Sequence, residues 1–225
     1  MTYNTTNRQK ILSGIDLLPG CGRKWIKKLY TNDPTRWWSL ERYLPKLEKE
    51  RKIYSAWFSG EKVYSLSKNR LKDKKKIPHD QVCGEALMRT KCSVPIVQFY
   101  SESQLRGLKF GAVPEWGALF PNGKLLLFEY STADNLKRKK LMERKIEQYE
   151  TNLYKFDEYF RAESLVLFVL EANRFKVEKF AEINKGERLF YCDLNSFLDV
   201  GNCAQLSTPI YIWGHDGGSY ALKDS

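Results

Sequence analysis

Two carboxylates in the second half of the chain have the type and spacing that metal-dependent hydrolysis requires. Glu115 lies at the start of one predicted strand, and Glu129 lies near the end of the next. In a hairpin these strand ends are adjacent, so both carboxylates can hold one divalent cation. Mg²⁺ or Mn²⁺ prefers such oxygen ligands and activates water against a phosphodiester. The chain has only two histidines, His79 and His215, which excludes a histidine-rich metal site.

The elements that must position these carboxylates form an α/β order. A turn at Pro121–Gly123 joins the two strands of the hairpin. The continuous apolar run 164–170 predicts a buried central strand. The expected elements are strands over 94–100, 114–120, 124–131, 164–170, 188–193 and 209–213, and helices over 78–89, 135–160 and 173–183. This order predicts a mixed α/β domain.

Positive charge is concentrated in the first third of the chain. The net charge of the whole chain is +11. Residues 1–76 contain 19 Lys and Arg against 7 Asp and Glu, a net charge of +12, whereas residues 77–225 contain 19 against 20, a net charge of −1. This segregation predicts a polyanion-binding domain over 1–76 and a second domain over 77–225.

Three short helices followed by a hairpin are expected in the basic domain. They are helices over 6–18, 23–30 and 34–50 and strands over 53–58 and 63–66. Pro45 lies inside the third helix, where we expect a kink or break. The order is that of a winged helix-turn-helix, a fold that binds duplex DNA.

The third helix is the expected recognition helix. If Trp37, Leu40, Leu44 and Leu47 face the core, the opposite face presents polar and basic side chains to the major groove. The residues expected to contact DNA are Arg36, Ser39, Arg42, Tyr43 and Lys46 on this helix, Lys24, Lys27 and Lys28 on the preceding helix, and Lys62 at the hairpin tip. In the alternative interpretation these residues are ordinary surface cations. The lysine-rich run 67–76 is either a solvated tether or a further contact with backbone phosphates.

A resemblance to a known family combines these features. The segment from Pro114-Glu115 to Glu129-Tyr130-Ser131 resembles the active-site hairpin of the PD-(D/E)XK nuclease superfamily, in which Pro-Asp is followed by an acidic residue, any residue and lysine. The layout of the chain is more specifically similar to the replication-relaxation family of plasmid and mobile-element proteins, which pair a winged helix with a nuclease-like domain. The residues that carry this similarity are Lys62–Leu66, Ile77–Asp80, and the hairpin followed by a helix with Lys145 and Tyr149.

The resemblance implies that Glu115 and Glu129 hold Mg²⁺ or Mn²⁺ in a DNA endonuclease. Glu115 stands where aspartate is usual, and Ser131 stands where the family has the lysine that polarises water and stabilises charge on the phosphate. Lys145, on the following helix, is the expected substitute for that lysine. Glu85 or Glu102 is the expected extra helical carboxylate that some members use. The alternative is that Glu115 and Glu129 are ordinary strand-end carboxylates on an inactive nuclease-like scaffold.

Two functions follow, from different classes. One is a DNA-binding protein of a mobile element with a metal-dependent endonuclease domain; the other is a non-enzymatic regulator or replication accessory whose second domain forms a homodimer or contacts a partner. An RNA-binding module is a third alternative. We expect no membrane partner, because no apolar run reaches the length of roughly 18 residues that a membrane span needs. The polar N-terminus and the unpaired spacing of the five cysteines favour a cytoplasmic location.

Overall fold

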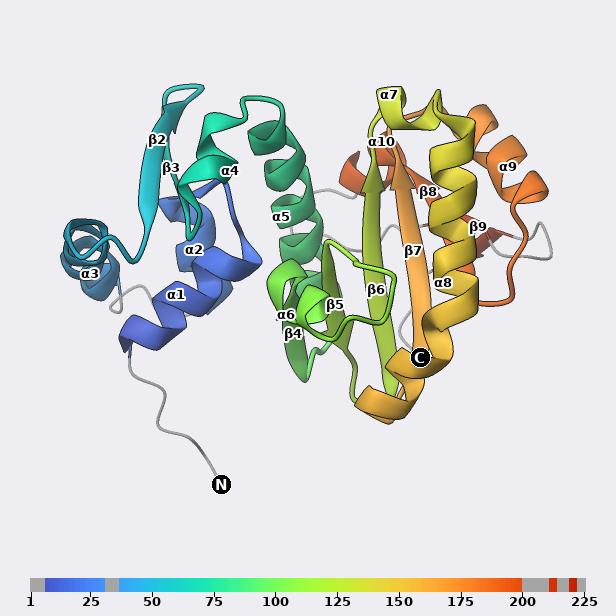
Figure 1. Cartoon of the computed structure of the whole chain (residues 1–225), viewed down its shortest axis with the longest axis horizontal. Helices are drawn as coiled ribbons and strands as arrows, with labels where there is room; N and C mark the ends of the chain where they lie inside the picture. The colour runs from blue at the N-terminus through green and yellow to red at the C-terminus, as the bar shows by residue number, and fades with distance from the viewer. Residues whose placement is uncertain (1–6, 31–36, 200–210, 214–218, 222–225) are drawn as a thin grey trace. The chain divides into compact units, whose positions relative to one another are not determined.

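A computed structural model describes residues 7–30, 37–199, 211–213 and 219–221 of the chain (Figure 1). At some of these positions, such as 28, 30 and 37–39, only the backbone is described. The chain forms two compact units, Met1–Met88 and Arg89–Ser225. Each contains helices and its own sheet, so the predicted mixed α/β class is confirmed. None of the helices in the described ranges combines the length and apolar character that crossing a bilayer requires.

The first unit is a small sheet with helices against it. Its elements are α1 (Asn7–Leu17), β1 (Cys21–Gly22), α2 (Arg23–Tyr30), α3 (Trp37–Lys49), β2 (Tyr54–Phe58), β3 (Glu61–Ser65), α4 (Lys68–Lys72) and the first part of α5 (Lys76–Ser93). The sheet order is β1-β3-β2, and both pairings are antiparallel. The central strand is therefore β3.

Successive residues of β3 point to opposite faces of this sheet and build two apolar cores. Tyr64 packs in the core between the sheet and α1, α2 and α3. Val63 packs on the other side against Leu71 of α4 and Ile77 of α5. The members of the first core are Ile11, Ile15, Ile26, Leu40, Leu44, Leu47, Ile53 and Tyr64. The predicted buried stripe of the third helix is thus confirmed at its leucines.

Three features of the first unit were not predicted from the sequence or were left open by it. The strand β1 follows Pro19-Gly20 directly and was not predicted, because two residues carry no periodic signal. The helix α3 continues through Pro45 to Lys49, since buried leucines on either side of this exposed proline hold it against the core. The segment 67–76, for which a solvated tether was one of two interpretations, contains α4, because Leu71 is buried and Arg70 forms an ion pair with Asp80.

The second unit is built on a seven-stranded mixed sheet. Its elements are β4 (Gln98–Ser101), α6 (Glu102–Gly107), β5 (Trp116–Leu119), β6 (Lys124–Ser131), α7 (Ala133–Leu136), α8 (Lys139–Phe160), β7 (Glu163–Leu170), α9 (Arg174–Ile183), β8 (Leu189–Asp193), α10 (Leu194–Asp199), β9 (Tyr211–Trp213) and β10 (Ser219–Ala221). The strand order is β10-β9-β8-β7-β6-β5-β4. The pairs β6–β7 and β7–β8 are parallel, and the others are antiparallel.

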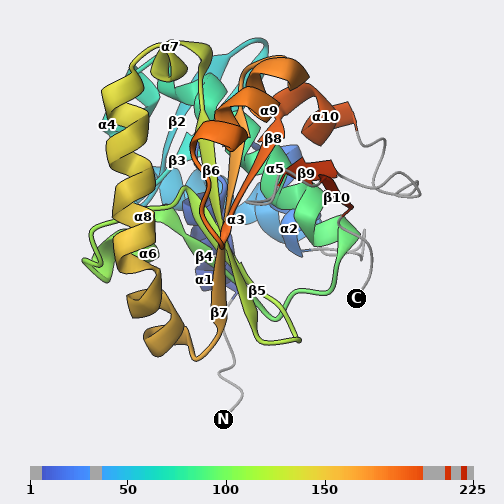
Figure 2. The ribbon, with the colours of Figure 1, turned by 90° about the vertical axis from the view of Figure 1, so that its right-hand side faces the viewer.

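Helices cover both faces of this sheet. On one face, α8 and α9 pack on apolar residues of β6, β7 and β8, including Phe168 and Tyr191. On the other face, the rings of Trp116 and Phe128 stack 4.5 Å apart, and Phe197 of α10 packs against Phe128. Figure 2 views the sheet nearly edge-on, with α8 and α10 on opposite sides. The predicted central strand is confirmed as β7, which lies between two parallel neighbours.

The long helix expected over 135–160 is two helices. The short α7 begins after Thr132, whose side chain accepts a hydrogen bond from the backbone of Asn135, and it ends at Leu136. The helix α8 then starts at Lys139 after Arg138, whose backbone is not helical (φ −91°, ψ 70°). The helix α6 was not predicted; Ser101 and Gln104 form a capping box at its start, in which each side chain bonds to the backbone of the other residue.

Candidate functional site

Glu129 is a carboxylate inside the mixed sheet of the second unit. It lies in β6, between β5 and β7, and its side chain is 0% exposed. Leu127, two residues earlier on the same sheet face, belongs to the core that α8 covers. The sheet therefore directs Glu129 from an apolar face toward α8. A carboxylate at such a position is unfavourable unless neighbouring groups bond to it.

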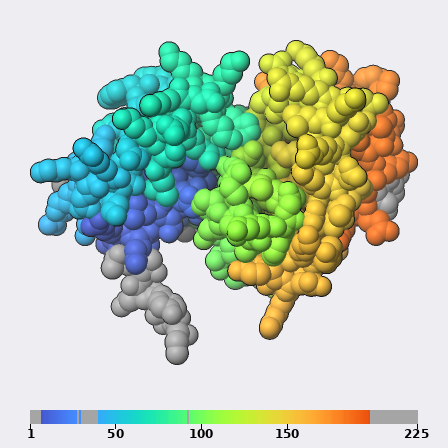
Figure 3. Space-filling model, in the orientation of Figure 1, coloured from blue at the N-terminus to red at the C-terminus, as the bar shows by residue number. Residues whose placement is uncertain are grey.

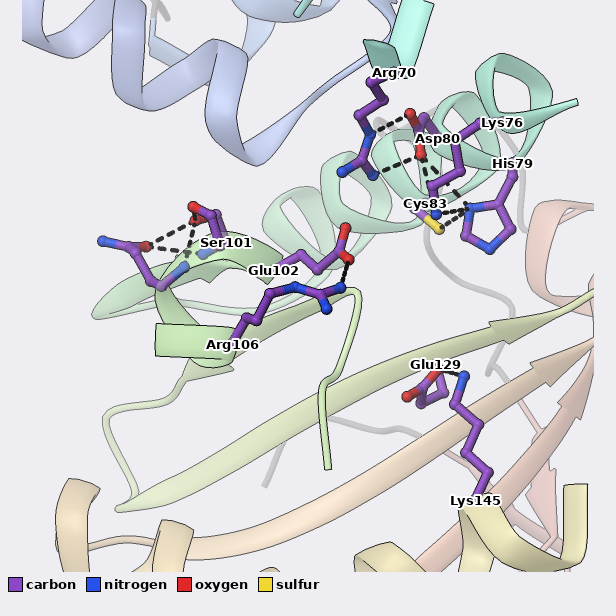
Figure 4. Close-up of polar contacts among 12 residues, drawn as sticks. Arg70, Lys76, His79, Asp80, Cys83, Ser101, Glu102, Arg106, Glu129 and Lys145 are labelled. Atoms are coloured by element: carbon purple, nitrogen blue, oxygen red, sulfur yellow. Dashed lines mark hydrogen bonds and ion pairs between the residues drawn. The ribbon is translucent and has the colours of Figure 1, made fainter. Parts of the chain in front are cut away.

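Two side chains of α8 supply those bonds. Lys145 and Tyr149 are four residues apart, which places them on the same side of the helix. The Nζ of Lys145 donates to Oε2 of Glu129, and the hydroxyl of Tyr149 donates to Oε1. Figure 4 shows Lys145 reaching from α8 to the carboxylate. Each oxygen of Glu129 thus has one donor, and both donors come from a single helix face.

Burial and charge act in opposite directions on this carboxylate. Burial raises the pKa of Glu129 from 4.5 to about 7, because desolvation disfavours the charged form. The ammonium of Lys145 lowers the pKa, and the nearby charge of Glu115 raises it. Burial and the Glu129 carboxylate raise the pKa of Tyr149 well above its ordinary value. Glu129 therefore takes up or releases a proton near neutral pH, while Tyr149 remains a donor.

Glu115 lies immediately before the neighbouring strand β5, close enough for its charge to act on Glu129. Glu115 directly precedes β5, whose first residue, Trp116, pairs with Phe128 of β6. The backbone N–H of Glu115 donates to the carbonyl of Phe128 at 2.9 Å. The charge of Glu115 raises the pKa of both Glu129 and Tyr149. The structure therefore places Lys145 in contact with Glu129, and it places Glu115 near enough for its charge to act on Glu129 and Tyr149.

The donor set of this site fits a hard divalent cation. Glu115 and Glu129 offer carboxylate oxygens, the ligands that Mg²⁺ and Mn²⁺ prefer. A carboxylate oxygen can accept more than one bond, so the bonds from Lys145 and Tyr149 leave lone pairs on Glu129. A buried carboxylate whose pKa is raised also gains from an added positive charge.

A pocket of about 320 Å³ opens beside these residues. Lys145 and Tyr149, the two donors to Glu129, form part of its wall. The other described residues that line it are Gly111, Ala112, Val113, Ser131, Asn135, Leu141, Met142, Arg144 and Gln148. The pocket gives a small ligand access to the side of α8 that carries the site.

Ser131 and Glu102 bond to other residues, and Glu85 belongs to the first unit. Ser131, at the position where the resemblance expects lysine, is buried, and its hydroxyl donates to the sulfur of Met142 at 3.4 Å. Glu102 lies on α6 and accepts from Arg106, one turn later on the same helix. Glu85 lies on the part of α5 that belongs to the first unit.

On the first unit, the helix α3 exposes part of the expected DNA-binding face. Arg42 and Lys46 are exposed, opposite the buried leucines, and so is Lys24 on α2. Tyr43 is partly buried and packs against the core, so only part of its side chain is exposed. Arg36 and the side chains of Ser39 and Lys28 lie outside the described residues.

The hairpin cation Lys62 is held within the first unit. Its Nζ lies 2.9 Å from a carboxylate oxygen of Glu48 on α3, which also accepts from Ser55. Lys62 also lies over the ring of Tyr64, 5.8 Å from the ring centre. Lys27 is partly buried. These contacts join the hairpin to α3, so Lys62 is less free for DNA than Arg42 or Lys46.

Sequence reasoning did not assign roles to Tyr149 and Arg144 at this site. The four-residue spacing between Lys145 and Tyr149 was visible and predicts a shared helix face. The position of Arg144 beside a pocket could not be predicted from the sequence, because the pocket is also lined by residues 111–113, which are distant in the chain. Scans and searches against family models, curated proteins and solved structures find no match to this chain.

Proposed function

We propose that this chain is a DNA-binding protein whose first unit grips duplex DNA and whose second unit cleaves a phosphodiester with a divalent metal. The order α1–β1–α2–α3–β2–β3, with β3 central in its sheet, supports a winged-helix interpretation of the first unit. The net charge of +12 over residues 1–76 supports an anionic partner. In this proposal Arg42 and Lys46 on α3 face the major groove.

The hairpin β5–β6 followed by α8 supports a nuclease-like second unit. One observation carries the catalytic proposal: Lys145 donates to Glu129 from α8, although Ser131 occupies the position of the usual lysine. The cation beside Glu129 thus comes from α8, whereas in the family pattern it comes from the same strand as the carboxylate. The same layout favours membership of the replication-relaxation family within the PD-(D/E)XK superfamily, and hence a role in plasmid replication or mobilisation.

The residues of the site have separate roles in this proposal. Glu115 and Glu129 would hold the divalent metal, which would supply a water nucleophile at neutral pH. Lys145 stabilises negative charge that develops on the phosphate. Tyr149 fixes the orientation of the Glu129 carboxylate through its hydroxyl.

Cleavage of supercoiled and linear DNA with Mg²⁺ or Mn²⁺, read beside a gel shift, tests the proposal. We expect Glu129→Gln to abolish cleavage and keep the shift, and Lys145→Ala to reduce the cleavage rate by roughly 100-fold. Glu163→Gln is the matched control, because Glu163 is an exposed carboxylate at the start of the adjacent strand β7. Metal-dependent cleavage that survives in Glu129→Gln would contradict the catalytic role of this site.

A second candidate is a non-enzymatic DNA-binding regulator or accessory protein. Ser131 favours it, because its hydroxyl is engaged with Met142 and carries no charge. The two donors already bonded to Glu129 also satisfy this carboxylate without a metal. A gel shift without cleavage in the wild-type chain, with both metals tried, would favour this candidate.

A further inference from the structure

The start of α8 and the residues just before it carry concentrated positive charge. Residues 137–145 contain six Lys and Arg against one acidic residue, Glu143. Lys137 pairs with Asp134 at 3.0 Å and Lys139 pairs with Glu143 at 3.6 Å. Lys145 pairs with Glu129. Charge on part of this segment is therefore already compensated within the unit.

Three exposed cations of the same segment are not compensated in this way. Arg138, Lys140 and Arg144 make no side-chain hydrogen bond or ion pair within the described part of the chain. Lys140 and Arg144 are four residues apart, so they follow one side of α8. Figure 3 shows this part of α8, in yellow, at the molecular surface.

Arg144 connects this charged side of α8 to the pocket. It lines the pocket together with Lys145 and Gln148, and Ser131 and Asn135 add polar groups to the wall. None of the described residues that line the pocket is acidic. The pocket thus has two cations, and within the described part of the chain only Lys145 has a carboxylate partner. This environment favours an anionic ligand.

We propose that the pocket binds a phosphate of the DNA backbone through Arg144, and that Lys140 contacts the next phosphates of the same strand. The planar guanidinium of arginine matches the oxygens of a phosphate and binds them with two parallel hydrogen bonds. A volume of about 320 Å³ accommodates a phosphate with its sugar. The inference rests on the proposed function, because it assigns the path by which the strand reaches Lys145 and Glu129.

Arginine footprinting on the full chain gives a local test. The chain is treated with phenylglyoxal, with and without a duplex oligonucleotide, and modification of each arginine is quantified by mass spectrometry. We expect DNA to protect Arg144 several-fold. Arg161 is the matched control, because it is exposed at the other end of α8, about 25 Å from Arg144 at 1.5 Å per residue.

A pair of double variants gives the second test. Each lost phosphate contact lowers the slope of log affinity against log salt by about 0.9, so Lys140→Ala/Arg144→Ala should lower it by about 1.8. Lys176→Ala/Lys179→Ala is the control, because it removes two exposed cations of α9 in the same unit. Equal slopes for the two double variants would overturn the inference.

Arg42 on α3 reports on DNA binding by the first unit in the same footprint. Protection of Arg42 without Arg144 would overturn the inference and leave DNA binding by the first unit intact. Protection of Arg144 without Arg42 would support the inference and contradict the role of α3. If DNA protects neither arginine, both the inference and the proposed DNA binding fail, and an acidic protein becomes the better ligand for this surface.

Discussion

At the scale of single residues, Glu129 is the buried carboxylate whose pKa is raised toward neutrality. A fully buried carboxylate with a pKa near neutrality is a group whose charge depends on what lies beside it. Lys145 and Tyr149 stabilise its charged form, whereas the apolar sheet face and Glu115 destabilise it. Residues with such opposing influences are frequent at functional sites, because they respond to a ligand or a proton.

The raised pKa of Glu129 predicts that stability falls as the pH rises. Between pH 4.5 and about 7, the folded chain keeps a proton on Glu129 that the unfolded chain has released. Folding therefore becomes less favourable through this window, by ~3 kcal/mol in the free energy of unfolding. Urea unfolding at pH 5 and pH 8 measures this change. Glu129→Gln should lose this pH dependence, and Glu163→Gln should keep it. Parallel pH profiles for the wild-type chain and both variants would contradict the raised pKa of Glu129.

Removal of the Tyr149 hydroxyl should destabilise the chain mainly at high pH. In Tyr149→Phe the ionised Glu129 loses the donor to Oε1, at a cost of about 1–3 kcal/mol. At pH 5 the carboxyl is protonated and the cost should be smaller. Chemical unfolding at both pH values tests this. Tyr154→Phe, at an exposed tyrosine on the same helix, is the control and should change the free energy of unfolding little. An equal loss in Tyr149→Phe at both pH values would argue that its partner Glu129 is not ionised at high pH.

At the scale of elements, short segments between the regular ones decide how each unit is assembled. In the first unit, α4 and α5 are joined by Arg70 and Asp80. The guanidinium of Arg70 donates to both oxygens of Asp80, at 2.6 and 2.7 Å, and the Asp80 side chain is fully buried. Lys76 lies 3.7 Å from the same carboxylate. This ion pair explains why a lysine-rich segment folds against the sheet.

Breaking this pair should destabilise the first unit. In Arg70→Met the buried carboxylate of Asp80 keeps Lys76 but loses its two-bond partner, and we expect a loss of about 2–3 kcal/mol in the free energy of unfolding. Lys68→Met, on the same helix, removes an exposed charge and should cost far less. Urea unfolding followed by circular dichroism compares the two. Similar losses would mean that α4 is held by its apolar contacts alone.

At the scale of the whole molecule, charge is divided unequally along the chain. The first 76 residues carry a net charge of +12, and the remainder is close to neutral with a local basic stretch on α8. Such a division favours electrostatic binding of DNA by the first unit and a contact limited to α8 in the second unit. DNA affinity should therefore depend strongly on salt and mainly on the first unit.

Substitutions on α3 test this division. Arg42→Ala should weaken DNA binding by about 1–3 kcal/mol if the arginine reads a base, and Lys46→Ala should lower the salt slope by about 0.9 if the lysine meets a phosphate. Fluorescence anisotropy with a labelled duplex at several salt concentrations measures both. Lys176→Ala is the control on α9. Unchanged affinity and slope in both α3 variants would contradict the recognition-helix assignment.

The sequence by itself determined the features that depend on local pattern. Apolar periodicity predicted α2, β6 and the leucine face of α3, because these elements bury one side along most of their length. The continuous apolar run predicted β7 because a strand between parallel neighbours is buried on both faces. The hairpin that carries Glu129 was predicted from the turn residues Pro121–Gly123 between two strand patterns.

Only the tertiary structure decided which distant side chains meet. The pairing of Arg70 with Asp80 holds α4 against the sheet, and Tyr43 of α3 buries part of its side chain against the core. The distance from β6 to Lys145 was not readable from the sequence, because it depends on how α8 lies across the sheet. Local periodicity specifies which face of an element is apolar, whereas contacts between elements depend on the packing of all of them.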